Sequence, residues 1–158
     1  MVKVRKASEA DIPEIRSIAH LGIDECVNTS SGDLIHIDSY FENDEYVKTA
    51  MDNDKCIVFV AESENKIVGW TIGFIQSQPT NAPFFREFKR AYLDTIDVIK
   101  EERGKGIGKK LIEEVEKWAK EKGLNKVVLE VYKENNNARI LYENLGYETI
   151  KETRRKKI

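Results

Sequence analysis

Apolar and polar residues alternate with two different periods along the first half of the chain, and each period predicts one type of element. Alternation at every second residue is typical of a half-buried strand, and apolar residues three and four apart are typical of a helix. Ser8, which can cap a helix, and Pro13 mark the start of the first helix. These signals predict, in order, a strand over 2–5, a helix after Ser8, a helix over 39–51, and a β-hairpin with strands over 56–62 and 67–75 around a loop at 63–66.

The second half of the chain predicts a strand that runs into a glycine-rich segment and a long helix. Leu111, Val115 and Trp118 belong to one apolar stripe of this helix, and Gly123 marks its end. The predicted elements are a strand over 91–99, the helix from 107, a strand over 126–132, a helix over 135–144 and a strand over 147–153. The order is therefore β α α β β β α β α β, a mixed α/β fold. A right-handed crossover through the long helix makes the strands before and after it parallel.

Glycines inside the predicted hairpin indicate a local irregularity. Gly69 and Gly73 both lie in the second strand of the hairpin, where a residue without a side chain weakens regular pairing. We therefore expect a bulge or a close approach of another backbone in this strand.

Length and charge limit what kind of protein this is. A chain of 158 residues argues for a single domain over residues 1–158, long enough to bury a core of its own. The net charge is −2, from 26 basic and 28 acidic residues, so no strong positive field attracts nucleic acid, and we expect no nucleic-acid partner. The longest unbroken apolar run, residues 56–61, is far shorter than the roughly 20 residues of a membrane span. The N-terminus lacks a signal-peptide pattern, so we expect no membrane association.

Cysteines and histidines are few. The two cysteines, Cys26 and Cys56, form no C-x-x-C pair and no disulfide framework, which favours a reducing, cytoplasmic location. His20 and His36 stand alone, without the spacing of metal ligands. We therefore expect no metal site.

The glycine-rich segment predicts an anion-binding site. Gly104, Gly106 and Gly108 free the backbone of side chains and permit positive φ angles just where the long helix begins. The first N–H groups of a helix have no partner within it and carry the positive end of its dipole. Lys105 and Lys109 add positive charge nearby. Together these features make a cradle for an anion.

Two common nucleotide patterns do not fit this segment. The Rossmann pattern G-x-G-x-x-G differs in spacing, and the Walker pattern would place its first glycine at Arg103 and a Ser or Thr at Lys110. A glycine-rich turn that binds nothing is the alternative that the spacing alone leaves open.

Two blocks of the sequence resemble the GNAT superfamily of N-acetyltransferases. The family's acetyl-CoA signature is Arg/Gln-x-x-Gly-x-Gly/Ala at a strand-to-helix turn, and Arg103, Gly106 and Gly108 match it. The family segment N-x-x-A-x-x-L-Y-E-x-x-G-F/Y is similar to residues 135–147. A proline that is common in the family before the signature is replaced by Lys100. The resemblance covers roughly residues 94–147.

The resemblance implies a fold and a cosubstrate. The GNAT fold is a single central, mostly antiparallel twisted sheet flanked by helices, with the strands over 91–99 and 126–132 as its parallel pair. The cosubstrate is acetyl-CoA, without a metal. The residues implied to bind it are Ile96, Asp97, Val98 and Ile99 along the pantetheine arm, Arg103, Gly104, Lys105, Gly106, Ile107, Gly108 and Lys109 around the pyrophosphate, and Asn135, Ala138 and Tyr142 on the following helix.

Two residues are candidates for proton transfer. The resemblance implies that Tyr142 protonates the departing thiolate, although an aromatic residue on a short amphipathic helix is also typical of a core. Glu130 stands in a Leu-Glu-Val context that resembles the branch of bacterial ribosomal-protein N-terminal acetyltransferases, in which such a Glu is the general base; a solvated charge is the alternative. Asn135 could contact the cosubstrate or cap its own helix.

These residues predict direct acetyl transfer from acetyl-CoA to a primary amine. An α-amine titrates near pH 8 and a lysine near 10.4, so a weak carboxylate base favours a protein N-terminal α-amine as the acceptor. A lysine, a small-molecule amine such as a polyamine, an amino acid or an aminoglycoside, and a non-catalytic acyl-CoA-binding regulatory module are the alternatives.

Many members of the family carry one more strand after the Gly-Tyr segment. The residues after Tyr147 leave no room for it, so we expect the basic tail 154–158 or a second copy, in a homodimer, to cover the free edge.

Overall fold

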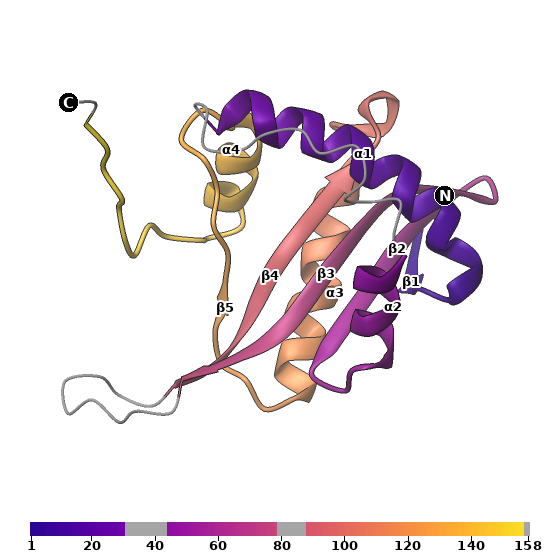
Figure 1. Cartoon of the computed structure of the whole chain (residues 1–158), viewed down its shortest axis with the longest axis horizontal. Coiled ribbons are helices and arrows are strands. Elements are labelled where there is room, and N and C mark those ends of the chain that lie inside the picture. The colour runs from indigo at the N-terminus through magenta and orange to yellow at the C-terminus, as the bar shows by residue number, and fades with distance from the viewer. Residues whose placement is uncertain (31–43, 79–87, 157–158) are drawn as a thin grey trace.

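The structure is a computed structural model that describes residues 1–30, 44–78 and 88–156. These residues form one five-stranded sheet in the order β1-β2-β3-β4-β5 (Figure 1). The strands are β1 (Lys3–Lys6), β2 (Cys56–Ser63), β3 (Lys66–Gln78), β4 (Phe88–Val98) and β5 (Val127–Val128), and the helices are α1 (Ile12–Thr29), α2 (Glu45–Asp52), α3 (Ile107–Glu121) and α4 (Asn136–Asn144). Neighbouring strands are antiparallel from β1 to β4, and β4 and β5 are parallel, which confirms the expected mixed α/β fold.

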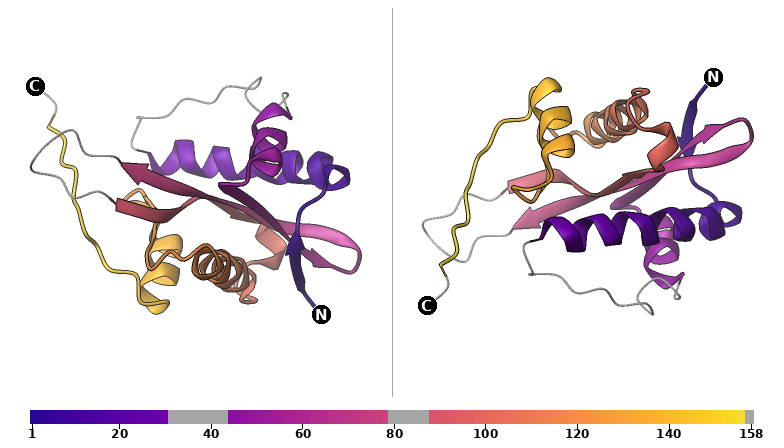
Figure 2. Two further views of the ribbon diagram at one scale, coloured as in Figure 1. Left: turned by 90° about the horizontal axis from the view of Figure 1, so that it is seen from below. Right: turned by 90° about the horizontal axis from the view of Figure 1, so that it is seen from above.

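Helices cover both faces of the sheet. Figure 2 shows α1 and α2 on one face and α3 and α4 on the other. Side chains of β2 alternate between the two cores: Phe59 packs with the residues of α3, whereas Val58 and Val60 pack with those of α1. Because this strand is buried on both faces, its sequence is an unbroken apolar run rather than an alternating one. The predicted stripe of α3 is fully buried, with Leu111 and Val115 at 0% exposure.

The β2–β3 hairpin has a tighter turn than the sequence predicted. Ser63 pairs directly with Lys66, so the loop has two residues and not four. Glu64 and Asn65 both have positive φ angles, 51° and 61°. Two consecutive left-handed residues twist the turn in the same sense as the strands that it joins, and Asn tolerates this conformation well.

A bulge in the centre of the sheet confirms the irregularity expected from the glycines. Ile72 pairs with Thr95 and Gly73 with Leu93, which leaves Asp94 of β4 as the extra residue. A side-chain carbon at Gly73 would come within 3.1 Å of Val115 on α3. Glycine therefore lets the helix pack closely on the irregular part of the sheet.

Three predicted elements differ in extent. The strand expected over 126–132 is reduced to β5, and the strand expected over 147–153 does not form, since residues 147–156 have no regular secondary structure. The last segment is mostly charged, and its Ile150 is 70% exposed, so it offers no apolar face to bury against the sheet. The helix expected over 39–51 is α2, whose predicted first residues, 39–43, lie outside the described residues.

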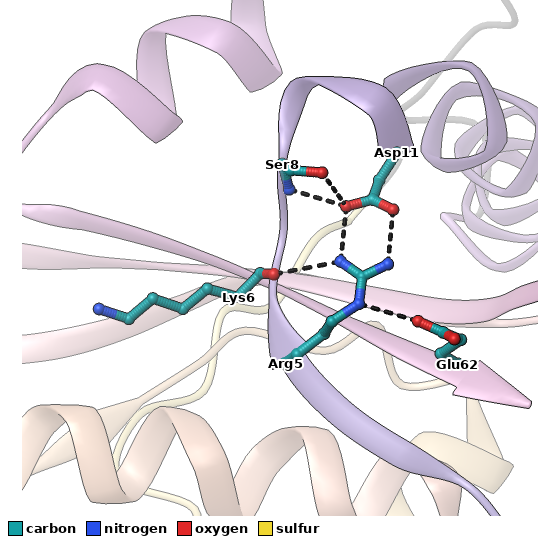
Figure 3. A network of polar contacts seen from close by, with 5 residues as sticks. All are labelled: Arg5, Lys6, Ser8, Asp11 and Glu62. Atoms are coloured by element: carbon teal, nitrogen blue, oxygen red, sulfur yellow. Dashed lines mark hydrogen bonds and ion pairs between the residues drawn. The ribbon is translucent and has the colours of Figure 1, made fainter. Parts of the chain in front are cut away.

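An ion-pair network joins β1, β2 and the start of α1 (Figure 3). The guanidinium of Arg5 donates to both carboxylate oxygens of Asp11 at 2.7 Å and to Glu62 at 2.8 Å. Asp11 also accepts hydrogen bonds from the backbone N–H and the hydroxyl of Ser8, at 2.7 and 2.9 Å. The hydrogen bonds from Arg5 lower the pKa of Asp11 to about 2, against the opposing effect of burial.

Replacing Asp11 with asparagine should destabilise the protein by about 2 kcal/mol at pH 7, because the bidentate charged pair is lost. Since the pKa of Asp11 is lowered on folding, the stability that it contributes is present above its unfolded pKa near 4 and disappears as the pH falls towards 2. Urea unfolding of wild type and variant, at pH 7 and near pH 2.5, measures the difference in stability between them. An equal loss of stability at both pH values would contradict this account of the network.

Candidate functional site

The candidate site lies at the carboxyl end of β4, where β5 leaves it. The parallel ladder joins Ala91 to Val127 and Tyr92 to Val128, and the chain of β5 then runs away from β4 (Figure 1). From Leu93 onward, β4 has no strand partner on this side among the described residues. The remainder of its edge is therefore unpaired.

The unpaired edge offers backbone groups of particular residues. The N–H of Ile99 donates to the carbonyl of Val68 on the β3 side, at 3.0 Å. Because backbone groups alternate in direction along an antiparallel strand, those of Ile96 and Val98 point away from β3. The carbonyl of Val98 accepts a hydrogen bond from Arg103, and the Val98 N–H and both backbone groups of Ile96 can pair with an extended ligand laid along the edge, as an added strand does.

The glycine-rich segment follows this edge and opens α3. Gly104 and Gly106 have φ angles of +74° and +79°, and a side-chain carbon at either would meet nothing within 4 Å. In the described part of the chain, the N–H of Lys110 is the first to bond back into the helix, to the carbonyl of Gly106 at 3.1 Å. The amides from 104 to 109 donate to no described backbone carbonyl. The segment is thus a run of unbonded N–H donors at the positive end of a helix.

The charges of the lysines near these amides are partly neutralised by glutamates. Lys105 donates to Glu102 at 2.8 Å, and Lys109 lies 3.8 Å from Glu113. All four side chains reach solvent, so these pairs are weak and an anion can compete for the lysines.

Gly108 brings α4 close to the start of α3. A side-chain carbon at Gly108 would lie 3.2 Å from Leu141 on α4 and 4.0 Å from Ile96 on β4. Glycine at this position therefore lets α4 pack against the glycine-rich segment. Asn135 caps α4 by accepting a hydrogen bond from the N–H of Ala138 at 3.2 Å, which favours the capping interpretation of this residue.

Tyr142 of α4 is a buried phenol at the end of β4. Only 8% of the residue is exposed, and its ring packs against Tyr147 with centroids 5.9 Å apart. Burial raises its pKa to about 12, and the charges of Asp97 and Cys26 act in the same direction. Among the described residues its hydroxyl has no hydrogen-bond partner. Because the hydroxyl is unpaired and is not shielded completely from solvent, it is available to a ligand.

Asp97 of β4 is the feature that the sequence analysis did not recognise. Its carboxylate accepts a hydrogen bond from the indole N–H of Trp70 at 3.0 Å and lies against Gly22 of α1. Burial raises its pKa to about 7, although the Trp70 hydrogen bond and the charge of Arg103 lower it. The sequence predicted only that the backbone of Asp97 contacts the cosubstrate. An acidic residue within the apolar strand end 96–99 was the signal available in the sequence.

The side chains of two further predicted site residues have these surroundings. The Arg103 side chain turns back to the strand, donating to the carbonyl of Val98 at 2.8 Å and pairing with Glu25 of α1 at 2.5 Å. Glu130 is exposed on the segment after β5. Its charge adds to burial in raising the pKa of Tyr92. The carboxylate whose charge acts on Tyr142 is that of Asp97.

The described residues contain no group of three His, Cys, Asp or Glu side chains that could hold a metal ion. Within the same residues, every helix is too short or too polar to cross a membrane.

Comparison with known proteins identifies the family of this chain. The sequence model of the acetyltransferase (GNAT) family matches residues 23–147. Human N-acetyltransferase 8B is 40% identical over 89 residues, which are 56% of this chain and only 37% of that protein. A mutant of the BH1408 protein from Bacillus halodurans has a similar fold, with a TM-score of 0.89, 24% identity and 99% of each chain covered. A predicted acetyltransferase from Clostridium acetobutylicum, solved with acetyl-CoA, gives a TM-score of 0.75 at 22% identity, covering 99% of this chain and 96% of that one.

Replacing Asp97 with asparagine should stabilise the folded protein by about 4 kcal/mol near pH 8, because about three pKa units are involved. Because the pKa of Asp97 is raised on folding to about 7, the wild-type protein loses stability as the pH rises from about 4 through 7. Asparagine carries no charge and retains an acceptor for Trp70. Urea unfolding should show that the variant is more stable than wild type near pH 8 and about equally stable near pH 4. A variant that is no more stable than wild type at pH 8 would contradict the raised pKa.

Proposed function

The chain belongs to the acetyltransferase (GNAT) family, and we propose that it transfers the acetyl group of acetyl-CoA directly to a primary amine. The observation that carries this proposal is the phenol of Tyr142, which has no hydrogen-bond partner among the described residues and lies in the same core cluster as Ile107 of α3, with Ile96 of β4 packed against that cluster. Acetyl-CoA supplies the activated acetyl group as a thioester. The chain itself has to bind the cosubstrate, position the amine and move the protons.

The residues present fit the two polar parts of coenzyme A. The unbonded amides from 104 to 109 suit the pyrophosphate, since the open space at Gly104 and Gly106 lets an anion approach the backbone closely. The backbone of Ile96 and Val98 suits the amides of the pantetheine arm, which would add a strand to the sheet. The arm would then end near Tyr142.

Tyr142 supplies the proton that the leaving group needs. A phenol whose pKa is about 12 stays protonated at neutral pH and is therefore a hydrogen-bond donor when the thioester is cleaved. Its hydroxyl can pass this proton to the thiolate of coenzyme A as the carbon–sulfur bond breaks.

We propose a peptide N-terminal α-amine as the acceptor. Two carboxylates, Asp97 and the nearby Glu25, lie at the end of β4, and they attract a cationic amine. An α-amine releases its proton near pH 8, within reach of a carboxylate whose pKa is about 7, whereas a lysine requires roughly 3 kcal/mol more.

The direct test measures thiol release from acetyl-CoA with four acceptors: a peptide with a free N-terminus, the same peptide with that terminus blocked and one lysine, a polyamine and an aminoglycoside. We expect the free α-amine to react fastest. A preference for the lysine or for a small amine would overturn the acceptor assignment only. Tight coenzyme A binding without turnover on any acceptor would instead identify a non-catalytic acyl-CoA-binding module.

Replacing Gly106 with alanine should weaken coenzyme A binding by about tenfold or more, because the new methyl group occupies the space in front of the amides. Gly123 is a matched control: its φ angle is +72°, against +79° at Gly106, and a side-chain carbon there also meets nothing within 4 Å. Both variants carry the same backbone strain, about 1 kcal/mol. Titration calorimetry should show an affinity loss for Gly106→Ala alone. Equal losses in the two variants would mean that the glycine-rich segment is only a turn.

Replacing Tyr142 with phenylalanine should lower kcat by about tenfold or more and change coenzyme A affinity by less than about twofold. The ring remains in the core, and only the donated proton is lost. Steady-state kinetics and calorimetry on the same samples separate the two quantities. Unaltered turnover would remove Tyr142 from the acid role.

A further inference from the structure

We propose that the guanidinium of Arg90 binds an acidic side chain of the acceptor peptide, several residues after the amine that is acetylated. This inference rests on the proposed function, and it names the class of peptide that the site takes. A carboxylate could also be that of a free amino acid, and its distance from the amine distinguishes the two sources.

The side chain of Arg90 lies on the sheet face that carries α1 and α2. Ala91 and Leu93 pack in the core with the residues of α3, so Arg90 and Tyr92, which alternate with them, point to the opposite face. Helix α1 crosses the carboxyl end of β4 and α2 lies against β2, so the amino-terminal part of β4 extends beyond both helices (Figure 1). Because Arg90 and Tyr92 are only partly buried, a ligand can reach them.

Two contacts hold the guanidinium of Arg90 in place. Its Nε donates to Oε1 of Gln76 on the neighbouring strand, at 2.7 Å. Its central carbon lies 4.4 Å from the centre of the Phe88 ring, a cation–π contact. The rings of Phe74 and Tyr92 stack beside this pair, with centroids 5.0 Å apart. The N–H groups of the two terminal nitrogens have no described partner, and they can hold a carboxylate in a bidentate pair.

Arg90 lacks the counter-charge that other partly buried arginines of this chain have. Arg5 pairs with Asp11, and Arg16 pairs with Asp44. Among the described residues, no carboxylate lies within ion-pair distance of Arg90. A positioned guanidinium without a counter-charge attracts an anion, and its planar fork matches a carboxylate.

The charges along β4 have a direction that suits a peptide with a cationic amino end and an acidic side chain further on. Asp97 lies at the carboxyl end of the strand, and Asp94 is exposed at the bulge. Arg90 lies nearer the other end. Burial and the charges of Glu130 and Asp94 raise the pKa of Tyr92, while the charge of Arg90 lowers it. Tyr92 therefore lies between the negative and the positive part of this surface.

The length of the strand sets where the acidic side chain should stand in the peptide. With the pantetheine arm paired along Val98 and Ile96, the thioester would lie at Ile96 or just before it. From there to Arg90 the strand runs for about 12 to 18 Å. An extended peptide advances by about 3.4 Å per residue, so its fourth to sixth residue would reach Arg90. A free amino acid, whose amine and carboxylate share one carbon, cannot span this distance.

The test measures kcat/KM for seven-residue peptides with a free amino terminus that carry either glutamate or glutamine at one position, from the second to the seventh. We expect glutamate at the fourth to sixth position to raise kcat/KM by about tenfold through a lower KM, and glutamate at the second position to change it by less than about twofold. Free alanine should be a poorer acceptor than any of the peptides. A free amino acid that reacts faster than the glutamate peptides would overturn the proposal.

Variants of two neighbouring cations test the residue itself. Arg90→Gln should reduce the preference for glutamate over glutamine from about tenfold towards equality. Lys89→Gln is the matched control, since it removes the same charge from an exposed residue on the opposite face of β4, and it should keep the wild-type preference. Arg90→Glu should reverse the preference, so that lysine at the fifth position is favoured over glutamate. A folding defect lowers the rate with all peptides alike, so the ratio reports on binding.

The outcomes separate this inference from the proposed function. If wild type acetylates no amine, the proposed function fails and the inference with it. If wild type acetylates peptides but does not distinguish glutamate from glutamine at any position, only the inference fails. A preference that survives in Arg90→Gln, or that falls equally in Lys89→Gln, would also overturn the inference and leave the proposed function intact.

Discussion

The packing of α3 on the sheet is the interaction on which the candidate site depends. The buried stripe of this helix, with Leu111, Ile112 and Val115 at 0% exposure, fixes the helix axis against β2, β3 and β4. Its amino end, with the unbonded amides, is therefore fixed near the carboxyl end of β4. The absence of a side chain at Gly108 then lets α4 come close enough to place Tyr142 there. One hydrophobic contact surface thus positions both the unbonded amides and the phenol.

Local patterns in the sequence predicted the parts of the site that depend on local geometry. The glycine-rich segment, the apolar stripe of α3 and the bulge near Gly73 each follow from residues close together in the chain. The end of β5 and the lost strand over 147–153 depend on whether a distant strand offers a partner, which no local pattern records. The surroundings of Asp97 likewise come from Gly22, Trp70 and Arg103, residues that are far apart in sequence. Periodicity could not reveal that these side chains meet.

Two aspartates of this chain show how surroundings decide the behaviour of one side chain. Asp11 receives two hydrogen bonds from Arg5 and two from Ser8, and its pKa falls to about 2. Asp97 receives one hydrogen bond from a neutral indole while it is largely removed from water, and its pKa rises to about 7. The first arrangement stabilises the fold, whereas the second keeps a charge where the fold would be more stable without it. Such local destabilisation is common where a group has to exchange protons.

The two-residue turn of the β2–β3 hairpin has a consequence for the order in which the chain folds. Closing so short a loop loses little chain entropy, whereas β1 can pair with β2 only by enclosing a long segment, as the contact between Arg5 and Glu62, 57 residues apart, illustrates. The hairpin can therefore form early as a nucleus, and the amino-terminal strand docks onto it late. The outer strand, although it is synthesised first, would then be the last part of the sheet to become ordered.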